Sequence, residues 1–183
     1  QLANFMAIEA QPQESEWAEL REAQNMTLRL HKTGQAVITD IGEAFDIHPR
    51  NKQDVGKRLA QNALKIAYGQ DVLGAGPVFE SMKKEGNKII LSFSNVGKGL
   101  STSDKNRYSY INGFTIAGSD RKFVWAQAYI HDGKVIVFND EIKEPVAVRY
   151  GWSNNPADNN LVNSDGLLAS PFRTDSWKGL TEK

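Results

Sequence analysis

The feature that most constrains the fold is a change of hydrophobic pattern near residues 74–77, where two glycines and a proline interrupt the chain. Before this point, apolar residues recur at helical spacing over about 14–31 and 51–69. After it, short extended runs follow one another. We therefore expect an α/β part over residues 1–73 and a β-rich part with an irregular C-terminal tail over 74–183.

Within the first part, residues 35–40 form an apolar, β-branched run that is typical of a buried parallel strand. Residues 1–5 fit the end of another strand. A helix, a strand, the loop 41–50 and a second helix follow one another, which is the order of a doubly wound sheet. The strand would deliver Asp40 at its carboxyl end, where open α/β sheets place their ligand and catalytic residues.

The second part is expected to be built from antiparallel strands. The pair Asp132-Gly133 separates two extended runs and predicts a two-residue hairpin. The predicted strands cover residues 88–94, 114–116, 123–130, 135–138 and 146–150. Aromatic side chains on these strands are expected in the core (Trp125, Tyr129, Phe138), whereas others could line a pocket instead (Tyr150, Trp152, Phe172).

Composition excludes several classes of function. Lys plus Arg and Asp plus Glu number 22 each, so the zero net charge gives no reason to expect a nucleic-acid partner. The absence of cysteine excludes disulfides and thiolate catalysis. No apolar run approaches the roughly 20 residues of a membrane-spanning helix. Three dispersed histidines without cysteine do not suggest a metal site, and we expect neither a metal nor a cofactor.

Among the three histidines, His48 is the candidate for catalysis. His31 lies at the end of a predicted helix, where the helix dipole favours an imidazolium, and His131 lies beside the predicted hairpin turn. His48 instead lies in the loop between the predicted strand and the second helix, with Asp46 two residues before it and Asp40 eight residues before it. A carboxylate can fix the tautomer of an imidazole that accepts a proton.

Three segments resemble the sialate O-acetylesterases, which belong to the SGNH hydrolase superfamily. The first is residues 1–5 with 17–24, the second is the histidine block 40–60 around Phe45-Asp46-Ile47-His48-Pro49, and the third is 148–156 with 166–175. The three blocks follow the family's order. The resemblance implies that residues 1–73 form the C-terminal half of a flavodoxin-like SGNH sheet, followed by a β-sandwich-like unit.

The resemblance also implies hydrolysis of an acetyl ester on a sugar, with a serine as nucleophile and His48 as its general base. Phe45 occupies the position, three residues before the histidine, where the superfamily usually has an aspartate. Asp46 is therefore our first choice as the supporting acid and Asp40 the second. A backbone carbonyl could orient the ring in place of either carboxylate.

The family's Gly-Gln-Ser-Asn type turn, which carries the nucleophile, is not present in this sequence. Gly151-Trp152-Ser153-Asn154 imitates it but follows the histidine, so we expect that Ser153 is not the nucleophile. The chain would then start within a longer protein, need a missing N-terminal half and be inactive alone. The family further implies a periplasmic or secreted location. The alternative function is a non-catalytic carbohydrate-binding or accessory β-module of a larger enzyme.

Overall fold

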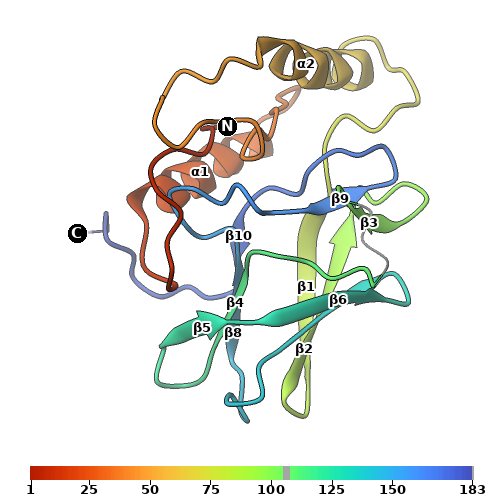
Figure 1. Cartoon of the computed structure of the whole chain (residues 1–183). Coiled ribbons are helices and arrows are strands. Elements are labelled where there is room, and N and C mark those ends of the chain that lie inside the picture. The colour runs from red at the N-terminus through yellow and green to blue at the C-terminus, as the bar shows by residue number, and fades with distance from the viewer. Residues whose placement is uncertain (105–107, 183) are drawn as a thin grey trace.

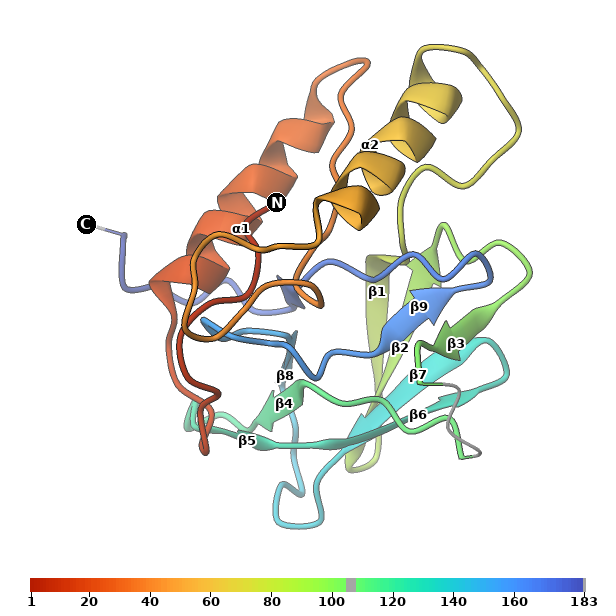
Figure 2. The same ribbon diagram turned by 45° about the horizontal axis from the view of Figure 1, so that its top comes forward.

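The structure is a computed structural model that describes residues 1–104 and 108–182. Its helices, α1 (Glu16–Met26), the 3-10 turn η1 (Thr27–Arg29) and α2 (Lys52–Ile66), all belong to the first part of the chain. Figures 1 and 2 show α1 and α2 together on one side of the molecule, with the strands on the other. A fold that combines helices with a larger β-rich portion is confirmed, whereas the division into two domains at residue 73 stays a prediction.

Both helices begin at side-chain caps. The Ser15 hydroxyl accepts a hydrogen bond from the Ala18 amide at 3.1 Å, and acidic residues follow in the first turn of α1. At α2, the Asn51 side chain accepts from the Asp54 amide at 3.1 Å. The predicted first helix is too long by about a turn, because the chain tightens into η1 after Met26.

No strand forms over residues 35–40 or at residues 1–5 in this structure, although strands were predicted at both places. Every ladder among the described residues is antiparallel and lies in the β-rich part. A strand requires a neighbour that pairs with its backbone groups. The segment 35–40 has no such neighbour here, so a flavodoxin-like sheet stays a prediction.

The strands form two antiparallel four-stranded sheets and a two-stranded ribbon. The first sheet has the order β1-β2-β7-β6, the second β10-β8-β4-β5, and the ribbon pairs β3 with β9. Their bounds are β1 Val78–Glu85, β2 Lys88–Ser94, β3 Leu100–Thr102, β4 Phe114–Ala117, β5 Phe123–Trp125, β6 Gln127–His131, β7 Lys134–Phe138, β8 Ala147–Tyr150, β9 Leu161–Asn163 and β10 Phe172–Arg173.

The predicted hairpin is confirmed. Asp132 and Gly133 connect β6 to β7 with φ values of 47° and 71°, the positive pair that a tight two-residue turn requires. The run predicted over 123–130 is divided into β5 and β6, which pair in different sheets. Four strands were not predicted from the sequence: the eight-residue β1, which is mostly exposed and rich in charged residues, and the short strands β3, β9 and β10.

One hydrophobic core lies between the two large sheets. It combines buried side chains of both sheets, including Leu91 and Val137 from the first and Ile116 and Val148 from the second. Tyr150 is fully buried in it, and Phe172 stacks on Phe79 with ring centroids 4.8 Å apart. None of the three aromatic residues predicted in the core belongs to it: Trp125 is 40% exposed, and Tyr129 and Phe138 are half-buried and contact each other, with ring centroids 6.3 Å apart. No helix among residues 1–104 and 108–182 is long and apolar enough to span a membrane.

Candidate functional site

His48 lies on the exposed loop between Ile41 and Arg50, immediately before α2 (Figure 1). Its ring Nδ1 is 3.3 Å from Asp46 Oδ1, and its backbone amide donates to the same oxygen at 2.9 Å. The hydrogen bond from the His48 backbone amide lowers the pKa of the Asp46 carboxyl below its usual value, and the hydrogen bond from the ring lowers it further. The carboxylate can therefore stay ionised and hold the proton of the ring on Nδ1, which leaves Nε2 able to accept a proton.

The loop is open to solvent at the imidazole. The His48 side chain is 85% exposed and that of Asp46 is 41% exposed. In the same loop Phe45 is 96% exposed and Ile47 is 51% exposed. Such exposure is unusual for large apolar residues.

Two contacts with the N-terminal arm, residues 4–15, hold the loop in place. The Gly42 amide donates to Asn4 Oδ1 at 2.6 Å, and the Met6 amide donates to the Ala44 carbonyl at 3.1 Å. Gly42 packs so closely on the Asn4 backbone that any side chain there would clash.

Asp40 is not brought to His48 by any contact among the described residues. Both of its carboxylate oxygens accept from the Arg58 guanidinium, at 2.6 and 2.7 Å, and Arg58 also donates to the Val37 carbonyl. The hydrogen bond with Asp40 raises the pKa of Arg58 above its ordinary value. This two-pronged pair ties the segment 35–40 to α2, and the geometry therefore favours Asp46 as the partner of the imidazole.

The serine-bearing turn at 151–154 lies inside a joint between the two parts of the chain. Ser153 is 8% exposed, and its carbonyl accepts from Arg21 at 2.7 Å. Arg21 is fully buried and donates to three further carbonyls, those of Leu2, Ala3 and Asn154. Arg21 of α1 thus joins the turn 151–154 to residues 2 and 3, and it has no carboxylate partner among the described residues.

Arginines of β8 and β10 extend this joint. Arg149, whose side chain is 3% exposed, donates to both oxygens of Glu14 at 2.8 Å and to Asp175 at 2.9 Å. Arg173 pairs with Glu22 of α1 at 2.9 Å. Both guanidinium groups also lie over the Trp152 ring, at 5.0 and 5.2 Å from its centroid. The first and third blocks of the sequence resemblance therefore meet in space as one polar joint.

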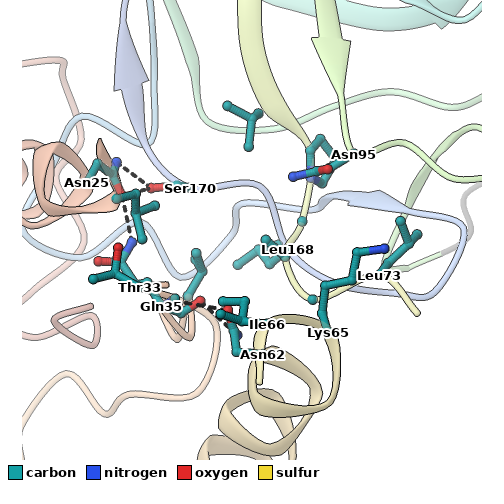
Figure 3. A pocket seen from close by; sticks show the side chains of 18 of the residues that line it. Asn25, Thr33, Gln35, Asn62, Lys65, Ile66, Leu73, Asn95, Leu168 and Ser170 are labelled. Carbon is teal, nitrogen blue, oxygen red and sulfur yellow. Dashed lines mark hydrogen bonds between the residues drawn. The ribbon is translucent and has the colours of Figure 1, made fainter. Parts of the chain in front are cut away.

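A large cavity of about 600 Å³ opens between the helices and the β-rich part. Figure 3 shows the hydrogen-bonded Asn25, Ser170 and Gln35 at one end, with Gln35 also bound to Asn62 of α2. Most of the residues that line this cavity are apolar, among them Ile66, Leu73 and Leu168. The residues that line it include neither His48 nor Asp46, so this cavity is separate from the candidate catalytic pair.

A smaller cavity of about 230 Å³, here called the junction pocket, was not predicted from the sequence. It lies between the arm and the β-rich part and is lined by Ile8, Glu9, Gly113, Thr115, Trp125, Gly151, Trp152, Ser153, Asn155, Pro156, Asp158 and Asn159. The only available signal was the Asn-rich tail, whose Asn155, Asn159, Asn160 and Asn163 are all buried.

Comparison with solved structures gives a close match. The chain is similar to a carbohydrate acetylesterase from Xanthomonas citri, with 50% sequence identity and a TM-score of 0.89 over 97% of this chain. The match covers 40% of the length of that protein, so this chain spans less than half of it. No protein-family model matches the sequence, and no curated protein matches it. The polar joint and the histidine loop thus belong to a fold that the Xanthomonas carbohydrate acetylesterase shares over two fifths of its length.

Proposed function

We propose that this chain is the histidine-bearing part of a serine esterase that removes O-acetyl groups from a carbohydrate. The observation that carries the proposal is the 50% identity with a carbohydrate acetylesterase over almost the whole chain. The pair of His48 and Asp46 is consistent with it, because an imidazole held by a carboxylate can take the proton of an attacking serine.

In this proposal the serine and the oxyanion donors come from further chain of the same protein. Its α/β fold would add strands to residues 1–5 and 35–40, complete an SGNH-type sheet and cover the exposed Phe45 and Ile47. His48 would accept the serine proton, pass it to the departing sugar oxygen and then activate the water that clears the acetyl group. The substrate would be an acetylated sialic acid or a related acetylated sugar, acted on in the periplasm or outside the cell.

The test is deacetylation of acetylated sugars by the protein in its full natural length. His48→Ala should lower kcat/KM for acetate release by about a thousandfold or more, since proton transfer by a positioned side chain contributes about 10²–10⁴-fold. His131→Ala is the matched control, because His131 is also exposed and also lies near an aspartate, at 3.5 Å from Asp132. An undiminished rate in the His48→Ala protein would overturn the proposal.

A second candidate function is that of a carbohydrate-binding accessory module. It is favoured by Trp125, which is 40% exposed at the junction pocket and donates its indole N–H to Ala10. Five other aromatic side chains of the β-rich part belong to the core or pack against it, which counts against a broad sugar-binding face: Phe79, Phe93, Phe114, Tyr150 and Phe172. Titration of an acetylated sialoside against the His48→Ala protein, with and without Trp125→Ala, would test it: equal affinity removes the exposed Trp125 from binding.

A further inference from the structure

The junction pocket gathers buried polar groups that have no partner. Seven buried side-chain atoms lack a hydrogen bond among the described residues, and five of them belong to residues that line this pocket. They are both carboxylate oxygens of Glu9, the indole nitrogen of Trp152, and both polar atoms of the Asn159 amide. Buried polar groups in folded proteins nearly always find partners, so this concentration points to a ligand.

Two of these side chains, those of Asn159 and Trp152, are almost completely buried. Asn159 is 3% exposed and Trp152 is 6% exposed. The Asn159 amide lies between Gly113 and Gly151, whose φ values of 83° and 59° suit glycine, and a Cβ at either position would clash with it. The two glycines thus make room for the Asn159 amide, although neither of its polar atoms has a hydrogen-bond partner among the described residues.

The pattern of donors and acceptors matches hydroxyl groups. The carboxylate of Glu9 only accepts, the indole of Trp152 only donates, and the Asn159 amide does both. A hydroxyl can satisfy each of them, because it is both donor and acceptor. The indole rings of Trp125 and Trp152 add apolar walls to the pocket, as is usual in small-molecule sites.

Charge and size narrow the ligand further. Glu9 and Asp158 are the ionisable residues of the lining, and both are acidic, so an anion is disfavoured. The nearby Arg149 is already paired with Glu14 and Asp175. A volume of about 230 Å³ is below the roughly 300–1,000 Å³ of sites for drug-sized ligands, and far above the roughly 30 Å³ of one water.

We propose that the junction pocket binds a single neutral, polyhydroxylated sugar ring. Binding itself does not depend on the esterase activity. The pocket nevertheless shares the arm with the histidine loop, since Met6 donates to Ala44 of the loop and accepts from the Asn155 side chain at the pocket. If the proposed function holds, the ring is part of the acetylated substrate, and that substrate carries a neutral sugar at this position rather than sialic acid.

Binding can be followed directly at the pocket. The protein in its full natural length is labelled with 5-fluorotryptophan, and the Trp152 resonance is assigned by its loss in Trp152→Phe. Methyl β-D-glucopyranoside and methyl β-D-xylopyranoside are the neutral probes, N-acetylneuraminic acid is the anionic probe and calcium chloride the cationic probe. We expect a saturable shift of the Trp152 fluorine signal with a neutral glycoside and none with the acid.

Glu9→Gln should weaken the glycoside at least about tenfold, because hydrogen bonds to a charged group are the stronger ones. Glu80→Gln, at an exposed position of β1, is the matched control and should bind as the unaltered protein does. Thermal unfolding of both variants excludes misfolding as the cause of a loss.

Three results would overturn the proposal: no shift with either neutral glycoside, a shift with N-acetylneuraminic acid alone, or a shift with calcium alone. Loss of the esterase function leaves a different signature, since His48→Ala should abolish acetate release while the glycoside titration at Trp152 is unchanged. The two proposals can therefore fail separately.

Discussion

The histidine loop and the polar joint differ in how far their charged side chains are buried and in how many partners those side chains have. The loop presents His48 and Asp46 to solvent and is held by a few backbone contacts to the arm. The joint buries Arg21, Arg149 and Arg173 and provides each with several acceptors from distant parts of the chain. A buried ion is tolerated only when its partners are complete, whereas an exposed pair can await a partner. The charged groups of the joint therefore already have their partners within this chain. The exposed pair of the loop is suited to contact with further chain of the protein or with a substrate.

The largest expected effect comes from breaking the joint. Arg149→Met removes the closer guanidinium partner of Asp175, whose side chain is 1% exposed, and also the partner of Glu14. The buried carboxylate of Asp175 keeps only Arg173, at 3.8 Å, and the Trp177 amide, at 3.3 Å. We expect the free energy of unfolding to fall by about 3–5 kcal/mol. Urea denaturation measures it, with Arg50→Met in the exposed loop as control, since that side chain is 83% exposed. Equal losses in the two variants would remove the distinction between joint and loop.

A smaller loss is expected at the edge of the joint. Gly113→Ala forces a residue with a side chain to adopt a φ of 83° and to collide with Asn159. Strain of this kind costs about 1–3 kcal/mol. Thermal or urea unfolding measures the loss, and Gly56→Ala in α2, where an added Cβ meets nothing within 4 Å, should instead be neutral or slightly stabilising. A Gly113→Ala protein as stable as the original would show that the backbone around Asn159 adapts.

Within the loop, the two aspartates should separate activity from stability. Asp46→Asn should lower kcat/KM of the full-length protein by about ten- to a hundredfold with little change in unfolding, because it weakens only the contact with the exposed imidazole. Asp40→Asn should mainly lower stability, by about 1 kcal/mol, since it removes the charge that Arg58 binds. The reverse result would make Asp40 the supporting acid.

The smallest effect concerns pH. Burial raises the pKa of Glu19, but hydrogen bonds from the Thr181 hydroxyl and from the Thr181 and Leu180 amides outweigh it, so the folded pKa lies below 4.5. The resulting stabilisation of the C-terminal tail is therefore complete above pH 4.5 and is lost as the pH falls through the folded pKa. Amide chemical shifts of Leu180 and Thr181 should titrate with a midpoint below 4.5, and Glu19→Gln should abolish the transition.

Local signals account for what could be predicted from the sequence. Asp132-Gly133 specifies its turn through backbone angles alone. His48 and Asp46 could be paired because they lie two residues apart. By contrast, residues 35–40 have strand composition but need a pairing partner that this chain does not provide. Glu9 and Asn159 are far apart in the sequence and come together at the junction pocket only in the folded chain. The hydrophobic periodicity of the sequence does not predict such a contact.

The four carbonyls around Arg21 also have a consequence for the order of folding. Two of them come from residues 2 and 3 and two from residues 153 and 154, more than 130 positions further along the chain. During synthesis, α1 is made before the turn 151–154, so its buried guanidinium finds its full set of acceptors only after more than 130 further residues have been added. Such high contact order slows folding. Until residues 153 and 154 are made, the Arg21 guanidinium lacks two of its four carbonyl acceptors, and the segments that it joins stay incompletely folded and open to aggregation.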